Sequence, residues 1–196
     1  ARLCADRGYE NTTVDQIAAA ADISPRTFSR YFPNKEAVIG ALIEEIAEHV
    51  AGALGRQPHD ITEHEALERA HLEVLRAAEA NAPGAMGFDR VNGFLQIVNG
   101  SPLLGLAAFT YRPESPMRPV IEALAGRMGI DENHPGVRIL FDTWAVLMAA
   151  ALGTPGTDVG GAGAVADRIE ETYALFTRLW RPWGPADPPP SGGSGR

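Results

Sequence analysis

Residues 24–35 form a short basic stretch whose side chains suit contacts with nucleic acid. The stretch contains no acidic residue, and its three cations are Arg26, Arg30 and Lys35. Thr27 and Ser29 share the polar arc of the expected helix with the two arginines, and such donors fit phosphate oxygens and base edges. The whole chain has 196 residues and a net charge of -8, so the pattern predicts a local DNA contact on an acidic protein. From this face alone, a solvated helix surface is an equal alternative.

Three closely spaced helix starts position this stretch. Thr13 followed by Gln16 fits a capping box, which opens a helix. Ser24 is a good N-cap and Pro25 suits the first helical position, so a second helix begins there. Asn34 is the expected N-cap of a third helix that runs to about residue 54. Two short helices joined by a tight turn are the layout of a helix-turn-helix unit.

The apolar face of the second helix is expected to hold it in place. Phe28 and Phe32 are four residues apart and therefore share a face. We expect this face to pack on Ile17, on Ile23 and on the following helix.

The remaining chain is predicted to be helical throughout, so the fold class is all-α. Apolar periodicity indicates helices over 61–82, 88–98, 103–111, 117–128, 137–152 and 165–180. Helix 137–152 is apolar on most faces, so we expect it to be buried on more than one side. The last 16 residues contain five prolines and four glycines, which predicts a disordered tail. The expected division is 1–47, 48–181 and a tail over 182–196.

The first residues look like the end of a helix. Residues 1–7 have helical character and Gly8 supplies a stop. A helix of seven residues is marginal, so we expect further residues before Ala1.

Composition and motifs argue against several other classes of protein. A lone cysteine, Cys4, excludes an internal disulfide framework and thiolate metal clusters. The sequence shows no glycine-rich phosphate loop, nucleophile elbow or paired Cys/His set, so we expect no enzyme, no catalytic residue, no cofactor and no metal. With no signal peptide and no apolar run near 18 residues, we expect a soluble cytoplasmic protein without membrane contact.

Residues 8–47 resemble the DNA-binding domain of TetR-family transcriptional repressors. The segments that carry this resemblance are GYENTTVDQIA at 8–18 and ISPRTFSRYFPNKEAV at 23–38. The resemblance implies an all-α homodimer with an N-terminal reader and a larger helical domain for ligand binding and dimerisation. It implies a one-component regulator, a repressor in most members, that binds a two-fold-symmetric DNA operator and is released by a small, largely apolar ligand.

The resemblance also implies which residues bind DNA. The candidates are Thr13, Ser24, Arg26, Thr27, Ser29, Arg30, Tyr31 and Lys35. Arg26, Thr27 and Ser29 match base-facing positions of the recognition helix. Ser29 stands where the family often has tyrosine, so the operator sequence does not follow from the resemblance.

The other candidates match positions near the DNA backbone. Thr13 and Lys35 match phosphate-contacting positions, each at the start of a helix. Arg30 and Tyr31 match positions that reach the backbone or an adjoining base. Tyr31 has a structural alternative, because it lies three residues after Phe28 and packing against the core would remove it from DNA.

The larger domain offers candidates for a ligand pocket among its large apolar side chains. These candidates are Phe88, Val91, Phe94, Leu95, Phe109, Met117, Trp144 and Met148. Ordinary core packing is the alternative for each of them. Asn92, Gln96 and Asn99 form a polar stripe on the same helix as Phe94, which suits either ligand orientation or a solvated face.

Two further features, a polar helix face and the helix 137–152, each allow two interpretations. His64, Glu68 and His71 share one helix face, which suits a polar surface or, less readily, a divalent metal. Helices 137–152 and 165–180 are the candidates for dimerisation. The first of them also suits the centre of a monomeric bundle.

The main alternative is a protein with the same fold that does not bind DNA. A dimeric small-molecule sensor that has lost DNA binding has the same helical domain. The acid-free basic stretch argues against this alternative, since a lost reader has no reason to keep it.

Overall fold

A computed structural model describes residues 11–100, 115–153 and 158–179, and every regular element in these ranges is an α-helix. The helices are α2 (Val14–Ala20), α3 (Pro25–Tyr31), α4 (Lys35–Gly55), α5 (Glu63–Glu79), α6 (Phe88–Gly100), α8 (Arg118–Met128), α9 (Pro135–Leu152) and α10 (Ala162–Leu179). The all-α prediction is therefore confirmed. The expected helix at 103–111, the helix end at 1–8, Cys4, Phe109 and the tail at 182–196 lie outside the described residues.

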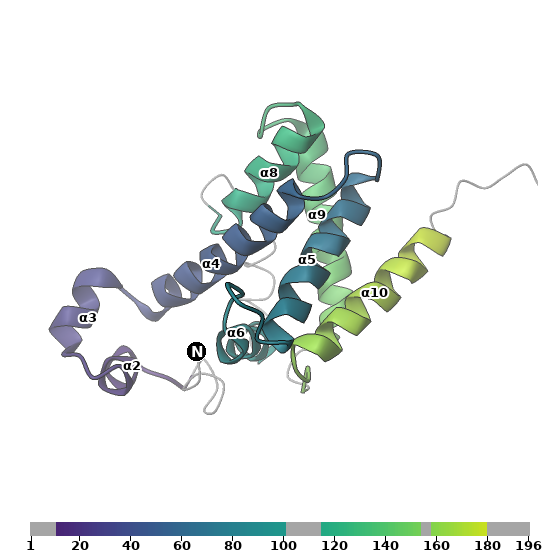
Figure 1. Cartoon of the computed structure of the whole chain (residues 1–196). Coiled ribbons are helices and arrows are strands. Elements are labelled where there is room, and N and C mark those ends of the chain that lie inside the picture. The colour runs from purple at the N-terminus through teal and green to yellow at the C-terminus, as the bar shows by residue number, and fades with distance from the viewer. Residues whose placement is uncertain (1–10, 101–114, 154–157, 180–196) are drawn as a thin grey trace, which may run out of the picture.

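The molecule consists of a helical bundle and a small unit joined to it by one long helix (Figure 1). We call residues 11–34, which contain α2, the turn and α3, the N-terminal unit. α4 leaves this unit and packs against α8 and α5, while α10 packs against α5 and α9. The bundle core is a single cluster to which α4, α5, α6, α8, α9 and α10 all contribute. Phe28 and Ala18 are buried in the N-terminal unit but are not part of this cluster.

Local capping determines where the first three described helices start. Thr13 Oγ1 accepts from the Gln16 N–H at 3.3 Å, and Gln16 Oε1 accepts from the Thr13 N–H at 3.0 Å, which completes the capping box. Asn34 Oδ1 accepts from the backbone N–H of Ala37 at 2.8 Å. These caps satisfy N–H groups that have no partner within a helix, and they confirm the predicted starts.

The start of α10 is determined by distant side chains. Asn92 Oδ1 on α6 accepts from the Ala162 N–H at 2.8 Å. Glu79 on α5 accepts from the Gly163 N–H at 3.1 Å. These side chains satisfy the first backbone donors, so α10 begins at Ala162, three residues before the predicted start.

The expectation that helix 137–152 is buried on more than one side is wrong for the single chain. One face of α9 packs in the bundle through Phe141, Trp144 and Met148, which are buried. On the outer face Ile139 is 65% exposed and Val146 is 68% exposed. α9 has 18 residues with a mean hydropathy of 1.4, which by length and composition is enough to cross a membrane. In the structure it packs against α10, α5 and α8.

Candidate nucleic-acid interface

Phe28 secures α3 from beneath. Its side chain is 3% exposed, and its ring centroid lies 5.4 Å from that of Phe32. Ile23, in contrast, is 38% exposed, so the expectation that it anchors this face is wrong. The turn explains the difference, because Asp22 has a left-handed φ of 55° and the Ile23 N–H is tied to the Ala18 carbonyl at 3.1 Å. This closure leaves the Ile23 side chain at the surface.

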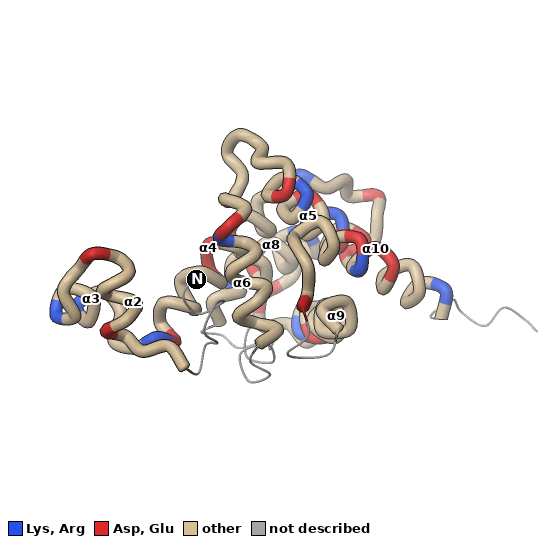
Figure 2. Tube along the Cα trace, turned by 90° about the horizontal axis from the view of Figure 1, so that it is seen from below, with Lys and Arg blue, Asp and Glu red and all other residues tan. Residues whose placement is uncertain are grey.

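The outer arc of α3 presents polar side chains to solvent. Arg26, Ser29 and Arg30 are exposed, and Thr27 is half-buried. Arg26 pairs with no acidic side chain in the described part of the chain. Figure 2 shows the cations on α3 at the end of the molecule that lies away from the mixed charges of the bundle.

Ser24 and Thr27 organise the first turn of α3. The Ser24 hydroxyl accepts from the Thr27 N–H at 3.1 Å, and the two hydroxyl oxygens lie 2.9 Å apart. Ser24 therefore serves as the N-cap that the sequence predicts. Because the Ser24 hydroxyl oxygen accepts this hydrogen bond from the helix, it fixes the orientation of the N-terminal turn that carries Arg26 and Thr27.

Arg30 and Tyr31 form a stacked pair at the end of α3. The guanidinium carbon lies 4.9 Å from the centre of the tyrosine ring, and Nη2 donates to the Tyr31 hydroxyl at 3.0 Å. Tyr31 is 66% exposed, so the alternative in which it packs into the core is wrong. The stacked ring holds the arginine head group, so cation and hydroxyl are presented to solvent together.

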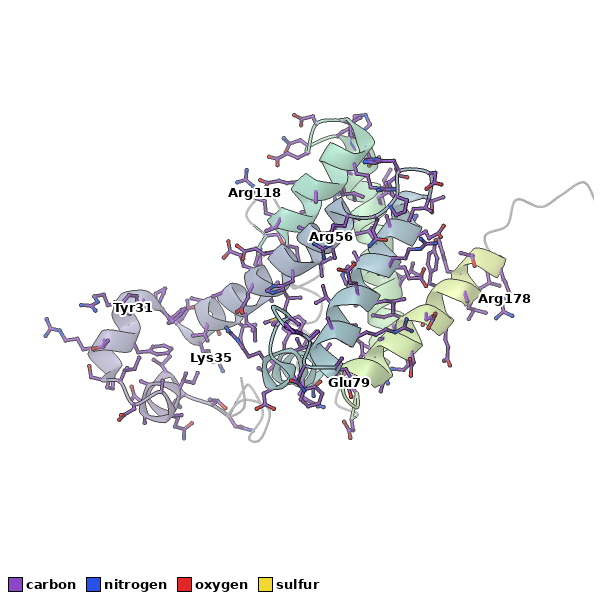
Figure 3. The ribbon with its side chains drawn as sticks, viewed as in Figure 1. Tyr31, Lys35, Arg56, Glu79, Arg118 and Arg178 are labelled. Carbon is purple, nitrogen blue, oxygen red and sulfur yellow. The ribbon has the colours of Figure 1, made fainter. Side chains whose placement is uncertain are left out.

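Thr13 and Lys35 both stand at helix N-termini. Thr13 caps α2, and Lys35 is the first residue of α4. Figure 3 shows Lys35 and Tyr31 at the same end of the molecule, far from Arg118 and Arg178. The partial positive charge of a helix N-terminus adds to the lysine charge, and this combination attracts phosphate.

Most of the predicted pocket residues lie in the bundle core. The buried ones are Val91, Phe94, Leu95, Met117, Trp144 and Met148. Phe88 is half-buried, and Phe109 lies outside the described residues. All six belong to the single core cluster of the bundle, and whether any of them contacts a ligand stays a prediction.

The polar stripe on α6 has a role that neither sequence interpretation foresaw. Asn92 caps α10, as described above, and Gln96 Nε2 donates to Asp158 Oδ1 at 3.3 Å. Asn99 is buried. The stripe therefore positions the chain that leads into α10.

The His64, Glu68 and His71 face is not an outer surface, because α10 and α9 pack on it. His71 is buried; its Nδ1 donates to the Leu67 carbonyl at 2.8 Å, and its Nε2 accepts from the Trp144 indole at 3.4 Å. Burial lowers the pKa of His71 to about 4. Both ring nitrogens are thus in use, and among the described residues no three such side chains form a metal-binding group.

Arg127 on α8 is a structural residue that the sequence analysis missed. Its guanidinium donates to the carbonyl of Gln57 at 3.0 Å, to that of Ile61 at 3.2 Å and to that of Pro58. It therefore clamps the connection between α4 and α5. Its partners are backbone carbonyls some 70 positions away, so no local pattern could reveal them.

Comparison with known proteins supports the same interpretation of the N-terminal unit. Residues 1–42 match the model of the bacterial regulatory proteins of the tetR family. The HTH-type transcriptional regulator TcmR of Streptomyces glaucescens is 34% identical over 126 residues, which cover 64% of this chain and 55% of the relative. The chain thus matches about half the length of that relative.

One solved structure is similar over most of the chain. It is that of Thermus thermophilus FadR, a TetR-family transcriptional repressor, in complex with lauroyl-CoA. The two chains are 22% identical, the match covers 95% of this chain and 94% of the other, and the TM-score is 0.47.

Proposed function

We propose that the chain is a one-component repressor of the TetR family of bacterial transcriptional regulators, whose model matches residues 1–42. It acts in the cytoplasm, binds a two-fold-symmetric operator as a homodimer and is released by a small, largely apolar ligand. The observation that carries DNA binding is the acid-free, solvent-exposed arc of α3, which a buried phenylalanine holds from beneath.

The exposed side chains divide into two groups by their position on the unit. Arg26, Thr27 and Ser29, on the first turns of α3, read base edges in the major groove. Phosphates are bound by the remaining donors, which are Thr13, Arg30, Tyr31 and Lys35. Ser24 contributes by capping α3, and its exposure supports a further contact with the DNA backbone.

The domain division that we propose has its boundary within α4. The N-terminal unit and the first part of α4 form the reader over 1–47, and 48–181 form the effector domain. Ile39 and Leu42 already belong to the bundle core, so α4 is shared by both domains. A ligand that binds the bundle more tightly when α4 is in one position shifts α4 toward that position. This shift changes the affinity for DNA.

Exposed aliphatic side chains support dimerisation through 137–152 and 165–180. Ile139 and Val146 are seven residues apart and share the outer face of α9. On α10, Leu175 is 48% exposed and Leu179 is 72% exposed. Pairing α9 and α10 with the same helices of a second copy forms a four-helix interface that covers these side chains. A central helix of a monomeric bundle has no reason to present such a face.

Selection of genomic DNA fragments by the purified protein, followed by sequencing, tests DNA binding. We expect enrichment of a two-fold-symmetric site, and we expect Arg26→Ala to keep the helical fold but to enrich a site that has lost its preference at one base position of each half. Absence of any enriched site, from protein shown to be folded and dimeric, refutes the proposal and favours the sensor that has lost DNA binding.

The dimer is tested separately by analytical ultracentrifugation. Val146→Asp places a charge on the outer face of α9, so we expect it to give monomers. Glu73→Gln, on an exposed position of α5 that pairs with Arg56, is the control and keeps the wild-type mass. A monomeric wild-type protein contradicts this part of the proposal.

A further inference from the structure

The contact between α5 and α10 contains more carboxylates than arginines to pair with them. Arg69 bonds Glu65 at 2.6 Å. Arg76 bonds Glu170 of α10 at 2.6 Å and lies 4.0 Å from Asp167. Both arginines are thus already engaged with other acids.

Glu68 is the carboxylate left over. It lies on α5 directly before Arg69 and is partly buried. In the described part of the chain it makes no hydrogen bond and no ion pair within 4 Å. Burying a charged carboxylate without a partner costs free energy. A carboxyl group avoids this cost by taking up a proton.

The neighbours of Glu68 supply no further cation. From α10 it faces Glu170 and Tyr173, and on α5 His64 lies one turn earlier. The His64 ring lies 5.6 Å from that of Phe176, and its Nε2 is buried with no partner among the described residues. Burial lowers the pKa of His64, so the imidazole is neutral at pH 7. α9 contributes the uncharged Trp144, whose ring meets that of Tyr173 edge-on with the centroids 6.4 Å apart.

The pKa of Glu68 agrees with its burial and its lack of an ion-pair partner. Burial first, and then the charges of Glu170 and Glu65, raise the pKa of Glu68 to about 7, while Arg69 and Arg76 oppose the shift. Burial also raises the pKa of Tyr173, so its hydroxyl stays neutral. Below pH 7, then, Glu68 is mostly neutral, while the neighbouring carboxylates Glu65 and Glu170 each bond an arginine.

We propose that Glu68 is a proton-operated contact between α5 and α10. In its neutral form it packs beneath α10, and in its charged form it is repelled by Glu170, so the contact loosens as the pH rises through neutrality. This inference does not rest on DNA binding. If the proposed dimer is correct, the same proton also affects the dimer, because α10 carries half of its face.

The test is the pH dependence of unfolding by urea, compared between the wild type and Glu68→Gln from pH 5 to pH 8. The folded-state pKa is raised, so the stabilisation is fully present below the unfolded value near 4.5 and is lost as the pH rises through about 7. An unscreened shift of this size lowers the folding equilibrium constant roughly 70-fold over the range. Because Glu68 is partly exposed, solvent screens its charge, and we expect about tenfold. His71, whose pKa burial lowers, titrates with the opposite sign in both proteins, so its effect cancels in the ratio.

Three comparisons separate this effect from a general loss of packing. Glu73→Gln removes another carboxylate from α5, one that pairs with Arg56 away from α10, and is expected to keep the wild-type pH dependence. Glu170→Gln is expected to move the transition to lower pH, and it keeps the proposal testable if Glu68→Gln does not fold. Hydrogen exchange, corrected for intrinsic rates, is expected to show faster opening of α10 at pH 8 than at pH 6 in the wild type only. A ratio of wild type to Glu68→Gln that is independent of pH, or equal α10 opening at both pH values, overturns the proposal.

Discussion

Phe28→Ala is expected to unfold the N-terminal unit while the bundle stays folded. The Phe28 side chain is 3% exposed and is not part of the bundle core cluster. Removing a phenylalanine ring from such a site costs about 3–5 kcal/mol. At about 1.4 kcal/mol for each factor of ten, the population of the open unit rises by roughly two to three orders of magnitude. A small unit with few buried side chains has little stability from which to lose this amount.

Hydrogen exchange with peptide-level resolution is the assay for this prediction. In Phe28→Ala, peptides that cover α2 and α3 are expected to exchange at nearly intrinsic rates, and DNA binding is lost. Peptides of α5 and α9 keep their wild-type protection. Phe141→Ala, at a site 1% exposed in the bundle, is the matched control and is expected to weaken protection in the bundle instead. Unchanged protection of α2 and α3 in Phe28→Ala would show that the ring does not form a separate core, and the reasoning would fail.

Further predictions concern the DNA contacts, the α4–α5 connection and His71. Lys35→Ala is expected to weaken binding to all DNA sequences alike and to reduce the salt dependence by about one unit in a log–log plot. Arg26→Ala is expected to relax discrimination at one base position by about 1–3 kcal/mol; a change of base preference in Lys35→Ala would contradict its assignment to phosphate. Arg127→Ala removes three bonds to backbone carbonyls, so the free energy of unfolding is expected to fall by about 2 kcal/mol. Arg118→Ala, an exposed change on the same helix, is expected to leave urea unfolding nearly unchanged, and equal effects of the two would refute the role of Arg127. For His71 the folded-state pKa is depressed to about 4, so its contribution is present above the unfolded value near 6.5 and is lost as the pH falls. From pH 8 to pH 5 this amounts to about 2 kcal/mol, and His71→Gln, which does not titrate, is expected to lack this loss in urea titrations.

The sequence by itself determined the fold class and the starts of the first three described helices. Thr13 with Gln16, Ser24 with Pro25, and Asn34 each act on N–H groups no more than four positions away. Such interactions are complete within one turn of helix, so no distant contact is needed to predict them. The basic arc of α3 was visible for the same reason, since helical period alone places those side chains on one face.

Which face each helix buries, and against what, was decided by the tertiary structure. Periodicity placed His64, Glu68 and His71 on one face of α5, but only the packing of α9 and α10 shows that the face is covered. The same holds for Asn92 and Arg127, whose partners lie about 70 positions away. A hydrogen bond or a burial cost depends on which groups the fold brings within a few ångströms, and that information is distributed over the whole chain.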